Sequence, residues 1–262
     1  MQSPLQWLSS RDNKSMRISS SIPYGWSFYD LDEVDSTNEE IKRLLKKDKS
    51  TPVLLIAKKQ TKGRGRLNRK WVSIEGNLLF SFALDFSELS AETISYLVSV
   101  SLINSIDVFL LNHKKEIQCK WPNDICFRGK KIAGILMEVF NSGKIVVVGV
   151  GVNLIQTYID NSLYLVGDLS EFSIDRKSLM FNFCNEFIRQ KLNFEKHGFG
   201  YIRDIWISRA RGIGSKIIVN LGHNQYTGIF RGVNNKGSLI LEQYNGEEKI
   251  ISTGDVIFIS GV

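Results

Sequence analysis

The sequence has few of the residues from which cross-links and metal sites are built. It contains three cysteines and three histidines, which are Cys119, Cys126, Cys184, His113, His197 and His223. An odd number of cysteines with no CxxC spacing argues against a disulfide framework, and the scattered histidines lack the spacing of a zinc site. We therefore expect all six side chains to be structural.

Long apolar runs are also missing. No stretch approaches the roughly 18 apolar residues of a membrane helix. The segment Met1–Ser21 is polar and lacks the apolar core of a secretory signal. These absences favour a cytoplasmic protein with no membrane partner, in which residues 1–22 form a leader or disordered arm.

Positive charge is unevenly distributed. The net charge is +7, but the composition is otherwise ordinary for a globular protein, with 43% hydrophobic and 23% charged residues. Much of the distinctive charge lies between Lys58 and Lys70. This concentration favours a local anion site over a general basic face for nucleic acid.

Hydrophobic periodicity divides the chain into two domains. Residues 23–211 combine strands and helices, including a β meander over 117–154, with helices expected from Ser36, over 91–111 and over 178–192. The strands of this domain are expected at 26–31, 53–57, 77–84, 117–121, 125–127, 132–140 and 145–154. Residues 212–262 instead show five short strands, expected at 216–221, 225–231, 238–242, 249–252 and 256–259. The pattern indicates an α/β domain followed by a small β-barrel.

The segment Ser36-Thr37-Asn38-Glu39 has the signature of a helix start. Ser36 and Glu39 have the spacing of a capping box, and apolar residues follow at helical spacing.

The most distinctive segment runs from Gln60 to Trp71 and reads QTKGRGRLNRKW. Its glycines allow the backbone to approach a ligand, and its arginines suit carboxylates and phosphates. Arg64, Arg66 and Arg69 should repel one another unless an anion neutralises them, so we expect the loop to order around one. The GxxxxGK[ST] pattern of a Walker loop is absent. By itself the segment is equally compatible with a solvated or nucleic-acid-binding loop.

Three further motifs follow strands. KWPND spans Lys120–Asp124, and the lysine that ends this strand is placed to project into a cleft. KIAGIL spans Lys131–Leu136, where small residues interrupt an apolar strand, as they do where a ligand or another backbone comes close. GVGVNL spans Gly149–Leu154, but it lacks the third glycine and the helix of a dinucleotide fingerprint, so we reject a Rossmann fold.

The order Ser36-Thr37-Asn38, GRGR…W, KWPND, KIAGIL and GVGVNL closely resembles that of bacterial biotin–protein ligases. The resemblance extends from about residue 26 to the C-terminus, and KWPND with KIAGIL at this spacing is its most specific part. It implies a mixed-sheet catalytic domain followed by an SH3-like barrel. The chain departs from the common GRGRRGR pattern at Leu67 and Asn68, and Ser73-Ile74 replaces the usual serine–proline.

The resemblance also implies roles for individual residues. The biotin site would comprise Ser36, Thr37, Asn38, Gln60, Arg64, Gly65, Arg66 and Lys120. The nucleotide side would comprise Arg69, Trp71, Asn123, Lys131 and Asn153. The catalytic group would comprise Lys120, Arg66 and Asp124, with Lys120 reaching both the biotin carboxylate and the α-phosphate, and Asp124 accepting or orienting a proton.

The implied reaction activates biotin with ATP and transfers it to one lysine of a biotin carboxyl carrier protein or carrier domain. Magnesium would arrive on ATP, so no protein metal site is expected. The alternative within the same fold is a lipoate ligase or octanoyl transferase. Only 35 residues precede Ser36, too few for an N-terminal helix-turn-helix domain, so we expect no specific DNA binding, and either a monomer or a homodimer.

Overall fold

The computed structural model describes residues 22–259, except for residues 24, 49–50, 87–88, 142 and 158–164. The expected leader or disordered arm, residues 1–22, therefore lies outside the described residues apart from its last position.

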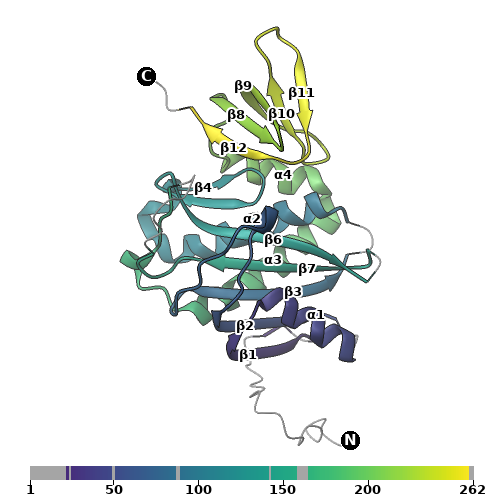
Figure 1. The fold of residues 1–262 in the computed structure, drawn as a ribbon, viewed down its shortest axis with the longest axis vertical. Helices are drawn as coiled ribbons and strands as arrows, with labels where there is room; N and C mark the ends of the chain where they lie inside the picture. The colour runs from purple at the N-terminus through teal and green to yellow at the C-terminus, as the bar shows by residue number, and fades with distance from the viewer. Residues whose placement is uncertain are drawn as a thin grey trace, which may run out of the picture.

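A mixed seven-stranded sheet forms the centre of the larger domain (Figure 1). Its strand order is β1-β2-β3-β7-β6-β5-β4, in which β1 and β2 are parallel and the other neighbours are antiparallel. The strands are β1 (Ser27–Val34), β2 (Val53–Gln60), β3 (Leu78–Asp85), β4 (Ile117–Lys120), β5 (Asp124–Phe127), β6 (Lys130–Phe140) and β7 (Ile145–Val152). The predicted mixed α/β architecture is confirmed.

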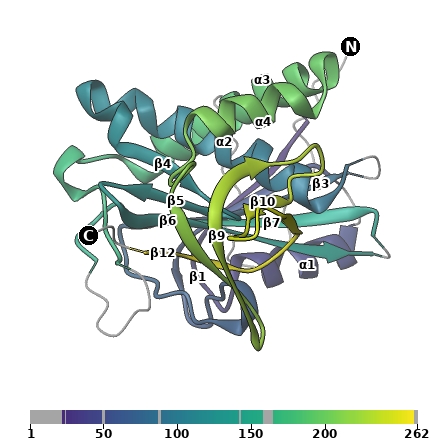
Figure 2. The same ribbon diagram turned by 90° about the horizontal axis from the view of Figure 1, so that it is seen from above.

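Helices cover both faces of this sheet (Figure 2). Helix α1 (Thr37–Asp48) lies on one face, while α2 (Ala91–Leu110), α3 (Arg176–His197) and α4 (Phe199–Ser208) lie on the other. The segment Thr93–Glu116 is long and apolar enough to span a membrane, contrary to the sequence-based expectation, but 72% of its apolar window is buried inside the protein. It is thus a core helix of this fold.

Two local expectations fail. Helix α1 begins at Thr37, as predicted to within one residue, but the capping box does not form. Asp35 Oδ1 accepts the Ser36 N–H at 2.7 Å, and the Glu39 carboxylate instead contacts Lys42 and Arg64. The sequence also gave no indication of α4, whose residues Ile202 and Trp206 are buried only by tertiary packing.

The C-terminal domain is a five-stranded antiparallel sheet of order β11-β10-β9-β8-β12. Its strands are β8 (Lys216–Leu221), β9 (Asn224–Val233), β10 (Leu239–Glu242), β11 (Glu248–Ile251) and β12 (Asp255–Phe258). All five predicted strands are present. The two domains share one apolar cluster, which extends from the α2 face of the large sheet into the small one.

Polar contacts fix the small domain on the large one. The Tyr96 hydroxyl on α2 donates to the Gly237 carbonyl at 2.7 Å, and the Trp121 indole N–H donates to the same oxygen at 3.3 Å. The outer edge of β4 also has backbone partners. The Cys119 N–H donates to the Arg209 carbonyl, and the Cys119 carbonyl accepts from the Arg211 N–H, both at 2.8 Å. The C-terminal domain is therefore held close to the end of β4 and the turn that follows it.

Candidate active site

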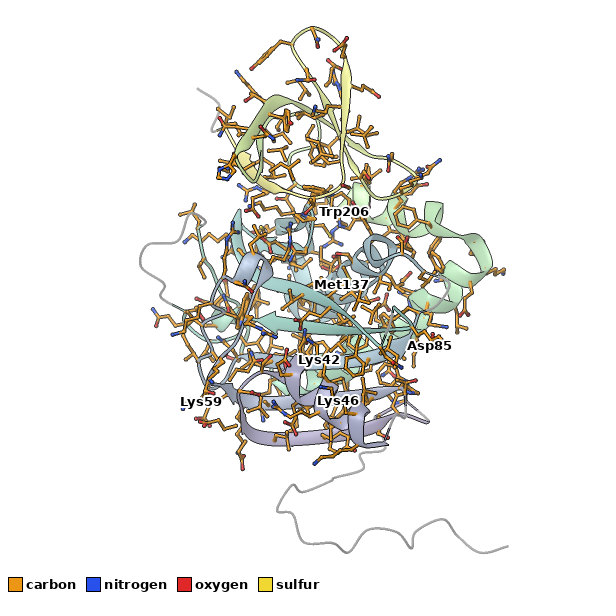
Figure 3. The ribbon with its side chains drawn as sticks, turned by 45° about the vertical axis from the view of Figure 1, so that its right-hand side comes forward. Lys42, Lys46, Lys59, Asp85, Met137 and Trp206 are labelled. Carbon is orange, nitrogen blue, oxygen red and sulfur yellow. The ribbon has the colours of Figure 1, made fainter. Side chains whose placement is uncertain are left out.

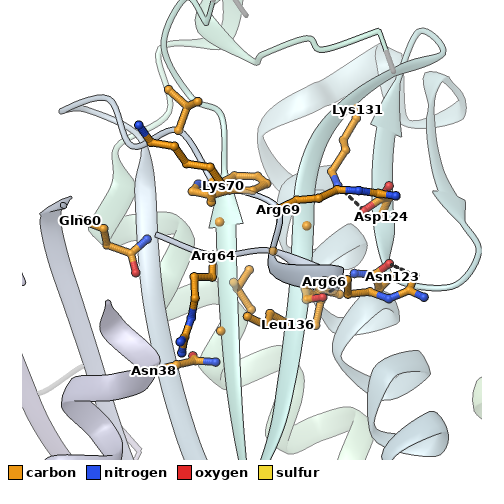
Figure 4. Close-up of a pocket in the computed structure, with 18 of the residues that line it drawn as sticks. Asn38, Gln60, Arg64, Arg66, Arg69, Lys70, Asn123, Asp124, Lys131 and Leu136 are labelled. Carbon is orange, nitrogen blue, oxygen red and sulfur yellow. Dashed lines mark hydrogen bonds and ion pairs between the residues drawn. The ribbon is translucent and has the colours of Figure 1, made fainter. Parts of the chain in front are cut away.

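A cavity of about 420 Å³ lies on the α1 side of the sheet, over β6 and β7 (Figure 4). Residues from the helix start, the basic loop, the three strand motifs and the C-terminal domain line it together. Every site residue named from the sequence lines this cavity except Lys120. The fold thus gathers segments that are far apart in the sequence around one space.

The glycines of β6 and β7 bring side chains close to the sheet. A Cβ atom on Gly149 would lie 2.5 Å from Asn38 Oδ1, and one on Gly151 would lie 2.5 Å from the Trp71 ring. A Cβ atom on Gly134 would lie 3.1 Å from the same ring. These glycines are therefore needed for close approach within a sheet, which agrees with rejecting a dinucleotide-binding motif.

A buried network of neutral polar groups forms one end of the cavity. Gln60 Oε1 accepts from the Thr37 backbone N–H at 2.8 Å and from the Thr37 hydroxyl at 3.0 Å. The Ser81 hydroxyl lies 2.6 Å from both Thr37 Oγ1 and Asn38 Oδ1. Because this end holds uncharged donors and acceptors, it suits a neutral polar ligand group such as a urea or amide.

Ser81 was not predicted to belong to the site. It is fully buried on β3 and interrupts the apolar run LLFSFAL. A hydroxyl inside a buried strand needs a hydrogen-bond partner. That requirement is the feature of the sequence that could have pointed to Ser81. The partner could not be read from the sequence, because Thr37 and Asn38 come from a different element.

We expect Ser81→Ala to weaken binding of the ligand held at this end, with little effect on turnover at saturation. Leaving one buried acceptor unpaired costs about 1–2 kcal/mol, which corresponds to about 5- to 30-fold in affinity. The measurement is KM for the small acid against kcat. Ser101→Ala is the matched control, because Ser101 is equally buried and its hydroxyl donates to the Leu97 carbonyl of its own helix. Wild-type KM in Ser81→Ala would remove this residue from the site.

Carboxylates hold the first arginine of the loop. Arg64 contacts Glu39 of α1, and its guanidinium lies 3.3 Å from Glu138 Oε1 of β6. The other oxygen of Glu138 accepts from Asn38 Nδ2 at 2.7 Å. Hydrogen bonds from Lys42 and Arg64 lower the pKa of Glu39, so this carboxylate stays ionised. Glu138 therefore connects the loop to the neutral polar network.

The other two arginines reach the C-terminal domain. Arg66 donates to Asn123 Oδ1 at 3.1 Å, to the Thr253 hydroxyl at 3.1 Å and to the Gly254 carbonyl at 3.2 Å. Arg69 forms an ion pair with Asp255. Protein carboxylates pair with Arg64 and Arg69, whereas these partners of Arg66 are neutral. The expectation that the loop orders around an anion therefore stays a prediction. The loop spans the cavity from α1 to β12.

The departures from the family pattern lie at the tip of this loop. Leu67 and Asn68 have φ angles of 53° and 57°, in the left-handed region. Asparagine tolerates this conformation, which explains how Asn68 replaces a glycine. Leu67 is less suited to it, and its side chain is 72% exposed. The tip therefore turns sharply without altering the arginine contacts on either side.

The cationic centre of the cavity is Lys131. Its Nζ lies 2.5 Å from Asp124 Oδ1 and 5.8 Å from the centre of the Trp71 ring. The Asp124 oxygen makes no aligned hydrogen bond within the described part of the chain, so charge alone holds the pair in this geometry. Lys131 and Asp124 thus form an ion pair that lines the cavity.

Lys120 is not among the residues that line the cavity. It is the last residue of β4 and pairs with Asp124 of β5, which does line the cavity. Its ammonium lies 5.9 Å from the centre of the Phe258 ring on β12. Burial lowers its pKa. Lys120 thus lies beside the cavity, at the junction of the two domains, and its catalytic role stays a prediction.

Two asparagines complete the nucleotide side named from the sequence. Asn123 Nδ2 donates to the Ile135 carbonyl at 2.6 Å, which fixes the KWPND turn against β6. Asn153 Nδ2 donates to the Gly167 carbonyl at 2.9 Å. Asp255, which the sequence did not indicate, also lines this side. Nothing in its local sequence distinguishes it from the other aspartates of the chain.

Comparisons with known proteins agree with this geometry. The profile of the biotin/lipoate A/B protein ligase family matches residues 31–154, and that of the biotin protein ligase C terminal domain matches residues 212–259. The chain is 30% identical over 241 residues to a biotin–[acetyl-CoA-carboxylase] ligase of Paracoccus denitrificans, covering 87% of this chain and 99% of that protein. It is 29% identical to the ligase of the same name from Mycobacterium tuberculosis, covering 79% of each.

Among solved structures, the biotin protein ligase from Aquifex aeolicus in complex with biotin and ATP is similar throughout. The TM-score is 0.78 and the identity 28%, with 88% of this chain and 99% of that chain covered.

Proposed function

The chain belongs to the biotin/lipoate A/B protein ligase family, and from this premise we propose how its cavity joins biotin to a carrier protein. The overall activity is that of an ATP-dependent biotin–protein ligase, as in the relatives that match nearly the whole chain. One observation supports the assignment of roles most strongly: a single cavity has a neutral polar end, a cationic centre and an aromatic end.

The neutral end, the cationic centre and the aromatic end of the cavity match the ureido group, the acyl phosphate and the base of biotinyl-AMP. The neutral network of Thr37, Asn38 and Gln60 would hold the ureido group of biotin, which is polar but uncharged. Lys131 would lie at the biotin carboxylate and the α-phosphate. Trp71 offers an aromatic surface for the base of the nucleotide. The aliphatic chain of biotin would then cross Leu136 between the first two parts.

In the first half-reaction a carboxylate oxygen of biotin attacks the α-phosphorus of ATP. The bond to pyrophosphate breaks, and biotinyl-AMP forms. Negative charge crowds the reacting centre, so the rate depends on positioning and on fixed positive charge. Lys131 and Arg66 supply that charge here. The described residues contain no cluster of metal-ligating side chains, and we propose that magnesium enters bound to the ATP phosphates and neutralises them there.

In the second half-reaction a lysine amine of the carrier attacks the acyl carbon, and AMP leaves. The nitrogen must lose protons to become an amide. Asp124 is the carboxylate nearest to Lys131 and lines the cavity. We assign it the role of accepting or orienting that proton.

Arg66 should control retention of the adenylate, because the closed loop depends on its contacts with Asn123 and the C-terminal domain. Arg66→Gly removes charge-assisted hydrogen bonds of about 1.5–3 kcal/mol and loosens the backbone. We expect biotinyl-AMP to dissociate about 10- to 100-fold faster and to label bystander lysines. The measurement is the release rate of preformed adenylate. Arg66→Lys keeps the charge without the planar fork and should be intermediate. Release at the wild-type rate from Arg66→Gly would show that this residue does not close the site.

Incubation with ATP, labelled biotin and a biotin carboxyl carrier domain tests the complete reaction. We expect label on the single acceptor lysine and none after that lysine is changed to arginine. Lipoate or octanoate supplied in place of biotin should give no product. A chain that labels the carrier with lipoate but not with biotin would belong to the lipoate branch of the family.

The cellular setting is also a proposal. Cys119, Cys126 and Cys184 are free and buried, and burial raises the pKa of each thiol. Unpaired inert thiols agree with a reducing cytoplasm. The absence of specific DNA binding remains a prediction. It is supported by the pairing of Arg64 and Arg69 with protein carboxylates, which leaves the loop less able to contact phosphates.

A further inference from the structure

A second cavity, of about 210 Å³, lies at the edge of β6 beyond the end of β5. Tyr96 of α2 and Trp121 line its buried interior. Ser252 and Thr253, in the turn between β11 and β12, are exposed and line its rim. The cavity is thus formed where the two domains meet, with its exposed side at the C-terminal domain.

Four residues line both this cavity and the active-site cavity. Arg66 and Asn123 line both spaces, and the hydrogen bond of 3.1 Å between them lies at the boundary. Ile135 and Leu136 of β6 also line both. Because the boundary includes a side-chain hydrogen bond, a rotamer change of Arg66 could join the two spaces without moving a strand.

We propose that the second cavity is the channel through which the carrier's acceptor lysine reaches the acyl carbon of the adenylate. This inference rests on the proposed function. After the first half-reaction the active-site cavity holds biotin and AMP as one molecule, and the loop from Gly63 to Trp71 spans it. The amine therefore needs a different approach, and the second cavity is adjacent to the cationic loop residue Arg66.

The lining suits a lysine side chain. Leu136 and Met137 offer apolar surface for its methylene groups, and Met137 lies below the C-terminal domain (Figure 3). Hydroxyl groups of Ser252 and Thr253 at the rim can accept from the ammonium before it enters. At the inner end, the positive charge of Arg66 disfavours a second cation and so lowers the pKa of the arriving amine. The channel thereby favours the neutral amine, which is the nucleophile.

The chemical step balances within the site. The neutral nitrogen forms a bond to the acyl carbon, and the bond from that carbon to the phosphate oxygen breaks. AMP leaves with the bonding electron pair, and Asp124 accepts the excess proton of the nitrogen. The products are the carrier amide, AMP and one proton, and no further reactant is needed.

The test separates the two half-reactions in the full-length protein. Ser252→Trp narrows the rim, and Met137→Trp fills the inner part, while neither residue lines the active-site cavity. We expect biotin-dependent pyrophosphate exchange and capture of the adenylate by hydroxylamine to be unchanged. Transfer to the carrier should fall about 10- to 100-fold, because small misplacements of reacting groups already cost about 100-fold. Ser252→Ala and Asn245→Trp, an exposed position on the distal turn of the same domain, are the controls and should transfer normally.

Normal carrier transfer by both tryptophan variants would overturn the proposal. Equal losses of exchange and transfer in both variants would also overturn it, because the cavity would then serve adenylation or folding. If the unsubstituted protein showed no biotin-dependent exchange, the proposed function would fail instead, so the two failures are distinguishable.

Discussion

Lys131→Ala should reduce the rate of adenylate formation by about 10²–10³-fold, the usual cost of removing one fixed donor from a developing negative charge. Lys131 is the cation in the middle of the cavity, next to Asp124 and Trp71. Its charge acts mainly when the carboxylate joins the α-phosphate, so affinity for biotin should change less than the rate. Single-turnover kinetics with saturating biotin and ATP measure this rate directly.

Lys120 provides the contrasting variant. The sequence motif favours Lys120 as the reacting cation, whereas the structure places it at the domain junction near Phe258. We therefore expect Lys120→Met, which keeps the aliphatic length, to form the adenylate far faster than Lys131→Ala. Lys131→Arg should recover part of the rate, because it keeps the charge in a different geometry. A severe loss in Lys120→Met with normal adenylation in Lys131→Ala would reverse this assignment.

The positions of most strands could be predicted because their apolar residues recur with the period of the structure. The C-terminal strands are an example, since turns such as Tyr244-Asn245-Gly246 separate short alternating segments. Helix α4 could not be predicted in this way. It begins directly after Gly198, whose φ of 75° ends α3, and its apolar residues are buried because α2, α3 and the C-terminal domain pack against them.

The residues of the site also divide into those that could be predicted from the sequence and those that could not. The motif residues Thr37, Gln60 and Trp71 were identifiable because their residue types and order resemble those of a known family. Ser81, Glu138 and Asp255 were not, because each acts through a contact with a distant segment. Their local sequences fit a buried strand, an alternating strand and a turn equally well. Their roles depend on contacts between segments that are far apart in the chain, and a single sequence does not show which segments meet.

Lys120 shows what a motif leaves open when it is read without the topology. A lysine that ends an apolar strand is correctly expected near a functional site, but the strand order decides on which side of the site it lies. Here β5 separates β4 from β6, and Lys131 of β6 is the one of the two lysines that lines the cavity. The two lysines are only eleven positions apart, and both motifs are characteristic of the family. The sequence does not say which of them lies over the reacting atoms.

Exchange of labelled pyrophosphate into ATP without any carrier tests the central claim most directly. The claim is that this one cavity activates biotin by itself, through the neutral network that holds the acid and the cation at Lys131. We predict exchange that requires both biotin and magnesium, that is absent with lipoate or octanoate, and that Lys131→Ala largely abolishes. Exchange supported by lipoate or octanoate and not by biotin would contradict the account.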